Sequence, residues 1–353
     1  MTSRAAAFAS DYRGPLALLV LLVAGWFGVG AADATTIATL VLALYYSIGG
    51  LSFNFLYGSL GILSLAQPVF VAVGGYTGIY LYDTYGVSPW LSLFIAPVIA
   101  AIIALPIALV AARIGGGAVL TALVTLIVSE AATPLLIAIK PLGGAVGLYA
   151  KSPPQPTFSA MQFASGTDYA RILLVINVLF IGFWMWWRRS RYGLFVTVIK
   201  EAPEAGESVG VASARMRIIV FLVAAMLAAP AGVVFAQYNL LTSPDLFLGA
   251  TAVFQFIVVA LVGGAARPWG ALVGSVLITY LSQEVSNLSS NAGAAPLTFA
   301  VVFLIMAMIV PRGLAGTWES IVNRRRPAVN ASLGPIAVRR SPGAADSQGV
   351  TAS

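Results

Sequence analysis

The stretch Pro89–Ala112 reads PWLSLFIAPVIAAIIALPIALVAA and contains no charged side chain. A helix of about 20 apolar residues crosses the hydrocarbon core of a bilayer, so this stretch is long enough to span a membrane. The chain as a whole has the same character, because 59% of its 353 residues are hydrophobic and 9% are charged. Soluble proteins have about 25% charged residues. The composition therefore predicts an all-α, polytopic integral membrane protein and disfavours a soluble enzyme.

Apolar runs like this one recur along most of the chain and predict about ten transmembrane helices. The first is expected to be a span and not a cleavable signal peptide, since no clear small-x-small site ends its long apolar run. The predicted spans are Pro15–Ala32, Thr36–Tyr57, Ser59–Tyr82, Pro89–Ala112, Gly117–Ile139, Ile172–Trp187, Ile218–Leu241, Ala250–Ala266, Gly270–Val285 and Leu297–Pro311. We predict a transmembrane domain over residues 1–316. Residues 317–353, rich in Arg, Pro, Gly, Ser and Ala, are expected to form a disordered basic tail.

The basic residues indicate how the chain is oriented. Ten spans put both termini on one side, and all but three of the 19 Lys and Arg residues then lie on that side. Cytoplasmic loops hold the excess of Lys and Arg, so we predict that both termini are cytoplasmic. Residues 188–217 then form the longest internal loop and residues 140–171 an external loop. Because the positive charges are spread over several loops, they indicate topology and contact with lipid headgroups, and no nucleic-acid partner is expected.

Two residue types with wide chemical use are missing. The chain has no cysteine and no histidine, which excludes disulfides, thiolate nucleophiles and the commonest metal ligand. The predicted spans also lack paired carboxylates and metal-ligand spacing, which argues against an intramembrane enzyme. We therefore expect no catalytic residue, metal site or cofactor in this chain.

The internal loop contains a short stretch with helix-end signals, Pro203-Glu204-Ala205-Gly206-Glu207-Ser208-Val209-Gly210. Proline suits the first turn of a helix and glycine its end, which leaves room for about two turns, or ~10 Å. Ala205 and Val209 would share one face, and Glu201 and Glu204 would lie on another. Spacing alone favours a solvated turn packed on the chain itself.

The motif Glu204-Ala205-Gly206-x-x-x-Gly210 resembles the Glu-Ala-Ala-x-x-x-Gly loop of bacterial ABC-transporter permeases, with Gly206 in place of the second alanine. A wider resemblance, to branched-chain amino-acid permeases of the LivM-like type, covers roughly residues 40–316. Its motifs are Leu63-Ser64-Leu65, Gly74-Gly75-Tyr76, Arg191-Tyr192-Gly193, Ser243-Pro244-Asp245, Val262–Gly274 and Pro311–Gly316.

The resemblance implies the transmembrane permease subunit of an ABC importer in a bacterial inner membrane. Its partners would be a second permease subunit, two cytoplasmic ATPase subunits and an external solute-binding protein. The chain lacks a Gly-x-x-x-x-Gly-Lys-Ser/Thr loop, so ATP and Mg would be bound by the partner ATPase. The implied solutes are branched-chain or other amino acids, with urea, short amides or sugars as alternatives.

In such permeases the short loop helix is the coupling element that docks on the ATPase. The residues expected to make this contact are Glu201, Glu204, Ala205, Gly206 and Gly210. Small side chains allow a partner to approach closely. The neighbouring Arg191, Lys200, Arg215 and Arg217 are expected to pair with acidic residues of the ATPase.

A proline breaks the third predicted span near Ala66-Gln67-Pro68. Backbone groups freed at a break are tolerated in a membrane where protein or a wet cavity satisfies them. Asn54, Ser64 and Gln67 then line a polar pathway. The alternative is a proline kink at which Gln67 is bonded to a neighbour.

Glu130 is the only acidic residue near the centre of a predicted span. An intramembrane carboxylate is costly, so Glu130 should face the bundle interior, neighbour a partner or be protonated. It is either a pathway or gating residue or a structural hydrogen-bonding group. A rival function, an ion-coupled secondary transporter, would use Glu130 to bind a proton and need no ATPase.

The run Val71–Gly75 resembles Val259–Gly264. Five spans separate the two runs, an odd number, so they lie in oppositely directed helices. This arrangement fits an inverted repeat of five helices with a pathway between the halves. The alternative is that Gly-Gly pairs are common in packed membrane helices.

Overall fold

The computed structural model describes residues 23–30, 32–114, 118–151, 157–201, 212–265, 267–288 and 301. The described helices are α2 (Ala34–Leu60), α3 (Gln67–Tyr85), α4 (Pro89–Arg113), α5 (Ala118–Ala138), α6 (Gly166–Arg189), α7 (Arg191–Glu201), α9 (Ser213–Asn239), α10 (Pro244–Phe247), α11 (Ala250–Gly264) and α12 (Gly270–Leu288). Two short strands, β1 (Leu148–Tyr149) and β2 (Leu241–Thr242), and two 3-10 turns, Lys140–Leu142 and Phe158–Ala160, complete the described part.

The structure confirms an all-α, polytopic membrane fold. Six described stretches are long and apolar enough to cross a membrane: Ala34–Leu60, Pro89–Arg113, Ala118–Ala138, Gly166–Arg189, Ser213–Asn239 and Pro244–Gly264. The second to the ninth predicted spans each correspond to a helix. Of the first, residues 23–30 are described and are helical, and nearly all of the tenth lies outside the described residues, as does the expected tail. The number of spans thus stays a prediction.

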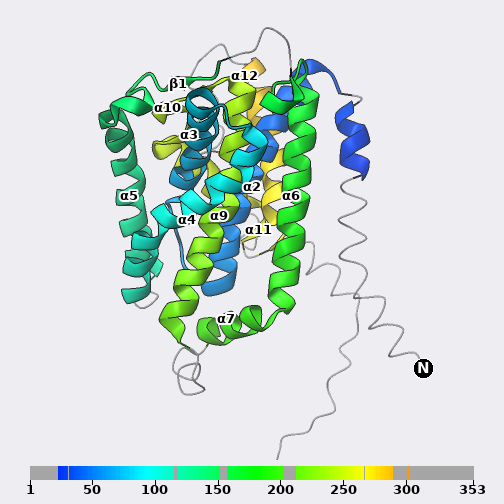
Figure 1. The fold of residues 1–353 in the computed structure, drawn as a ribbon. Helices are drawn as coiled ribbons and strands as arrows, with labels where there is room; N and C mark the ends of the chain where they lie inside the picture. The colour runs from blue at the N-terminus through cyan, green and yellow to red at the C-terminus, as the bar shows by residue number, and fades with distance from the viewer. Residues whose placement is uncertain are drawn as a thin grey trace, which may run out of the picture. The chain divides into compact units, whose positions relative to one another are not determined.

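Helix α9 lies inside the bundle, with α3 and α4 packed against it (Figure 1). The contact with α3 depends on two glycines that face each other's backbones. A Cβ added at Gly74 would overlap the carbonyl oxygen of Ala229, and one added at Gly232 would overlap that of Val71. Helices in membranes pack through such small residues because lipid supplies no hydrophobic drive for their association.

The second glycine run, Val259–Gly264, also allows two helices to pack closely. A Cβ added at Gly263 of α11 would overlap the carbonyl oxygen of Gly270 at the start of α12. Both glycine runs that suggested an internal repeat therefore lie at close helix contacts. Close packing explains the two runs by itself, and the inverted five-helix repeat stays a prediction.

The third predicted span was placed wrongly at its start. Helix α2 continues to Leu60 and is closed by Gly61, whose φ of 70° gives a left-handed cap with its N–H bonded to the Tyr57 carbonyl. Residues 61–66 are not helical, and α3 begins at Gln67 with Pro68 in its first turn. Proline is tolerated there because a first-turn N–H has no partner within the helix. The predicted break at Ala66-Gln67-Pro68 is real, and it separates two helices.

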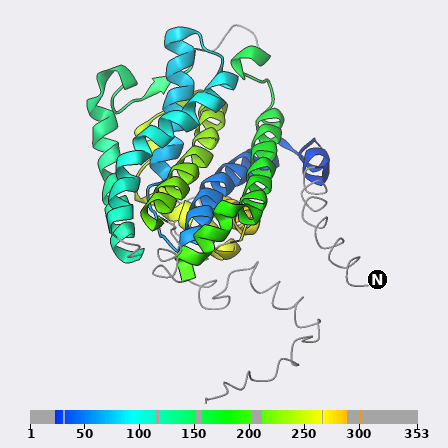
Figure 2. The ribbon, with the colours of Figure 1, turned by 60° about the horizontal axis from the view of Figure 1, so that its bottom comes forward.

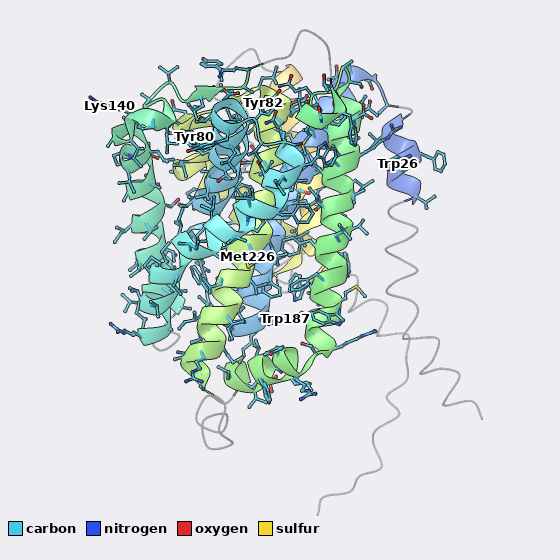
Figure 3. All side chains as sticks on the ribbon, viewed as in Figure 1. Trp26, Tyr80, Tyr82, Lys140, Trp187 and Met226 are labelled. Atoms are coloured by element: carbon cyan, nitrogen blue, oxygen red, sulfur yellow. The ribbon has the colours of Figure 1, made fainter. Side chains whose placement is uncertain are left out.

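The two ends of the bundle hold different loops. Strands β1 and β2 pair antiparallel at one end, with Leu148 opposite Thr242, and α7 lies across the other end against α2 and α6 (Figures 1 and 2). Figure 3 labels Lys140 at the first end and Trp187 near the second. The loops predicted to be external and internal thus lie at opposite ends of the bundle.

Candidate functional site

The segment between α2 and α3 is held by side chains from its own loop and from α5. Thr125 of α5 accepts a hydrogen bond at Oγ1 from the backbone N–H of Leu65, at 2.9 Å. The Oγ atom of Ser64, a buried residue, accepts from the N–H of Ala66 at 3.4 Å. Non-helical backbone inside a membrane needs such partners, since lipid offers none. The break is thus a built feature, with Thr125 as its support.

Gln67 is enclosed at this break without a hydrogen bond. Its side chain is 2% exposed, and neither Oε1 nor Nε2 has a partner among the described residues. A buried polar atom left unpaired costs about 1–3 kcal/mol. Such groups in native structures call for a reason, for example an unseen water or a ligand that binds there. Gln67 therefore keeps its hydrogen-bonding capacity available at the start of α3.

Asn54 lies at a different contact. Its Nδ2 atom donates to the carbonyl oxygens of Gly264 at 3.3 Å and Ala260 at 3.5 Å, at the last turn of α11. Its Oδ1 atom is buried and has no partner in the described part of the chain. The structure therefore places Ser64 and Gln67 together at the helix break and Asn54 at the joint between α2 and α11.

Glu130 is exposed on α5, outside the interior of the described bundle. The buried face of the same helix consists of Thr121, Thr125, Ser129 and Ala132. Of the three settings expected for this carboxylate, the interior of the described bundle is ruled out. The two other predicted settings of Glu130, contact with a partner and a protonated carboxyl group, stay predictions.

Helix α7 lies against the end of α2 and is tied to it by a lysine. The Nζ atom of Lys200 donates to the carbonyl oxygen of Gly58 at 2.9 Å. The prediction that Lys200 pairs with an ATPase carboxylate did not foresee this bond. A lysine beside a helix C-terminus is favourable because the last carbonyls have no partners within the helix and carry partial negative charge. A cavity of about 290 Å³ adjoins this contact and is lined by residues that include Ser59, Trp184, Arg188 and Thr197.

The other face of α7 points away from the bundle. Its inner face buries Gly193, Val196 and Ile199, while Leu194 and Val198 are exposed. Glu201, the last residue of α7, is exposed as well. The expected coupling residues Glu204, Ala205, Gly206 and Gly210 lie outside the described residues.

Three tryptophans, Trp184, Trp186 and Trp187, lie near this end of α6. Trp184 and Trp187 are buried and pack edge-on against Phe55 of α2, with ring centroids 5.8 and 5.7 Å away. Only Trp186 is exposed. The pair fixes α6 against α2 beside the Lys200 contact.

Sequence reasoning missed Thr121, Thr125 and Ser129. They follow one another at spacings of four, which puts them on one face of a helix. That pattern was visible in the sequence and marks the side of α5 that packs inward. The cap formed by Lys200 gave no sequence signal, because it joins residues far apart in the chain.

A second cavity, of about 500 Å³, lies between α3, α4 and α5. Its lining is mainly aliphatic and aromatic and includes Tyr76, Tyr80, Ile103 and Leu135. It offers little to orient a polar solute, so the break at Gln67 remains the better candidate for contact with the solute.

Known proteins similar to this chain are membrane transport components. The family model described as "Branched-chain amino acid transport system / permease component" matches residues 35–311. The high-affinity branched-chain amino acid transport system permease protein LivM of Escherichia coli is 26% identical over 328 residues, covering 85% of this chain and 73% of LivM.

Two other relatives are permeases from other organisms. A probable branched-chain amino acid transport permease, LivH of Methanocaldococcus jannaschii, is 24% identical over 75% of this chain and 87% of its own length. The fructose import permease protein FruF of Bifidobacterium longum is 26% identical over 42% of each chain. No solved structure matches the chain.

Proposed function

Since the chain belongs to the family of permease components of branched-chain amino acid transport systems, we propose that it is the membrane subunit of an ATP-driven importer of small polar solutes. Branched-chain and other amino acids are the first candidates for the solute. The observation that carries the proposal is the family match over residues 35–311, which spans the described bundle from α2 to α12. The chain is a multi-pass transport subunit and not an enzyme.

The motor belongs to other chains in this proposal. Two cytoplasmic ATPase subunits bind ATP and Mg and dock on the end of α7 and the loop that follows it, through Glu201, Glu204, Ala205, Gly206 and Gly210. The apolar side chains that α7 leaves exposed, Leu194 and Val198 among them, support a protein contact at this end. The end of the bundle with α7 then lies in the cytoplasm, as do both termini.

Motion of α7 reaches the pathway through the end of α2. Lys200 holds the Gly58 carbonyl, and three residues later Gly61 ends α2 and begins the non-helical segment that leads to Gln67. A displacement of α7 on nucleotide binding would therefore move the segment that contains Ser64. Alternating access follows if the two positions of this segment open the pathway to opposite sides.

The other components complete the importer. A second permease subunit pairs with this chain in the bacterial inner membrane, and an external solute-binding protein delivers solute to the opposite end. Residues 140–171 and 242–249, joined there by the β1–β2 pairing, are the proposed landing area. The similarity to a fructose permease keeps sugars as a second class of solute, and urea and short amides remain further alternatives.

The test is transport by the complete complex. The chain is co-purified with its ATPase, second permease and binding protein and placed in proteoliposomes, and uptake of labelled leucine, fructose or urea is measured with and without internal ATP. ATP-dependent uptake of leucine or another amino acid supports the proposal. Uptake driven by a pH gradient without any ATPase, and abolished in Glu130→Gln, would overturn it in favour of an ion-coupled transporter.

A further inference from the structure

Helix α5 is the least enclosed of the candidate spans, with 22% of its apolar window buried. It stands at the side of the bundle, as Figure 1 shows. One face, Thr121, Thr125, Ser129 and Ala132, packs inward. Val128 and Leu136 flank this face and are partly buried against the core, and the opposite side of the helix is exposed.

The open side contains a regular stripe. Leu123, Ile127, Glu130 and Pro134 are all exposed and follow each other at spacings of four, three and four. That spacing places them in one line along the helix, in the pattern by which membrane and coiled-coil helices meet a neighbour. We name these four residues the Glu130 stripe.

Glu130 lies at the middle of the span. At 1.5 Å per residue it is about 18 Å along the helix from Ala118 and about 12 Å from Ala138. A carboxylate at this depth that faced lipid would have no hydrogen-bond partner, and intramembrane acidic residues almost always face protein or water. The stripe is therefore not a lipid-facing surface in the assembled protein.

Two apolar runs of this chain lie outside the described residues, and their sequences show which side chains they could offer to Glu130. Leu297–Pro311 reads LTFAVVFLIMAMIVP, with Thr298 near its start as the sole side chain able to hydrogen-bond. Residues 15–22 read PLALLVLL and contain none. Neither run contains a basic or amide side chain, so a basic or amide group that meets Glu130 would come from another chain.

We propose that the Glu130 stripe packs against the second permease subunit, and that Glu130 hydrogen-bonds there to a basic or polar side chain of that subunit at mid-membrane depth. The inference rests on the proposed function, in which two permeases pair. It assigns α5 to the subunit interface, and it gives Glu130 a role in assembly in place of proton binding.

The experiment uses the complete complex in nanodiscs, with the photo-crosslinking residue p-benzoylphenylalanine at Ile127 or Leu123. The matched control is the same residue at Leu179 of α6, which is 66% exposed where Ile127 is 67% exposed. We expect Ile127 and Leu123 to give an adduct with the mass of the second permease, and Leu179 to give none. Adducts with lipid alone, or within this chain, at both stripe positions would overturn the proposal.

A second measurement tests the carboxylate itself. Glu130→Leu removes the hydrogen-bonding group, whereas Glu130→Gln keeps one. We expect Glu130→Leu to lower the amount of second permease recovered with this chain in mild detergent by at least about tenfold, which corresponds to ~1.4 kcal/mol of association free energy, and Glu130→Gln to lower it less. Equal recovery in all three proteins would contradict the role of Glu130.

The two proposals fail in different ways. If the complex shows ATP-driven uptake but the stripe cross-links to lipid alone, the interface is wrong and the importer stands. If no ATPase is recovered with this chain and uptake needs none, the importer itself is wrong, whatever the stripe contacts.

Discussion

The Nζ atom of Lys200 lies 2.9 Å from the carbonyl oxygen of Gly58 and joins α7 to the last turn of α2. This bond links the helix nearest the expected ATPase contact to the helix that precedes the break. The hydrogen bond suits a mechanical connection, because Gly58 lies three residues before Gly61, the residue that caps the end of α2.

Replacing this lysine should uncouple the two helices. We expect Lys200→Met to lower solute uptake per ATP hydrolysed by several-fold, while ATPase subunits still bind, because the apolar face of α7 is unchanged. The loss of stability should be small, ~0.3–1 kcal/mol, because the lysine is exposed. Uptake and phosphate release measured on the same proteoliposomes give the ratio. Lys200→Arg retains a donor and should keep most of the coupling, and an unchanged ratio in Lys200→Met would sink the idea.

Gln67 and Asn177 both have a buried side-chain amide, but they differ in their hydrogen bonds. Asn177 accepts from Ser47 at 2.6 Å and donates to the carbonyls of Leu44 and Leu173, whereas the Gln67 amide has no partner among the described residues. Asn177→Leu should lower the free energy of unfolding by about 1–3 kcal/mol, because it leaves buried groups unpaired. Gln67→Leu should leave stability equal or higher and reduce uptake.

Thermal unfolding in detergent and uptake in proteoliposomes separate these effects. A Gln67→Leu protein that transports at the normal rate would show that this amide does not serve the pathway. Loss of both folding and uptake would show that the Gln67 amide makes a hydrogen bond in the membrane that stabilises the fold.

Thr125 supports the helix break from α5. Thr125→Val removes the acceptor for the Leu65 N–H, and we expect it to cost about 1–3 kcal/mol, because that N–H is left without a partner away from water. Hydrogen exchange followed by mass spectrometry should show faster exchange in residues 61–66. Thr125→Ser keeps the acceptor and should exchange like the wild type, and equal exchange in all three proteins would contradict this support.

The glycine contact between α3 and α9 should tolerate no methyl group. Gly232→Ala pushes a Cβ into the carbonyl of Val71, and overpacking of this kind costs about 1–3 kcal/mol or more. Gly28→Ala is the control, because nothing lies within 4 Å of a Cβ added there. The melting temperatures of the two variants in detergent should differ, with Gly28→Ala at or above the wild type.

The carboxylate of Asp33 should make the start of α2 sensitive to acid. The hydroxyl of Thr36 donates to it at 2.6 Å, and this bond lowers the pKa of Asp33 below its usual value. A lowered carboxylate pKa gives stability that is fully present above the usual pKa and is lost as pH falls through the lowered one. In Thr36→Val the pKa of Asp33 should rise towards its usual value, which isotope-edited infrared titration would detect. An identical titration in both proteins would refute the contact.

Local sequence signals located most helices. The uncharged run at Pro89 predicted α4 with its start at the right residue. Pro68 predicted a break within the third span, and the structure shows that this break separates α2 from α3. The end of α2 was missed because Gly61 sits in an apolar run and only its left-handed backbone, visible in the structure, shows that it closes the helix.

The sequence predicted where a helix lies along the chain better than which way its side chains face. Hydropathy places Trp184 and Trp187 near a membrane boundary, but which way a side chain faces depends on neighbours such as Phe55, far away in sequence. The same limit applied to Glu130, whose depth followed from the sequence and whose exposed side did not. Contacts between distant segments, like that of Lys200 with Gly58, leave no local trace.

The pairing between β1 and β2 would constrain how solute enters the proposed importer. It fastens a loop that precedes α6 to one that follows α9, with Leu148 set against Thr242 and the Ala150 N–H bonded to the Leu240 carbonyl. An opening between these two loops would require their backbone hydrogen bonds to break. Solute is therefore expected to enter at the interface between neighbouring chains, while the paired loops of each chain move together as a rigid unit.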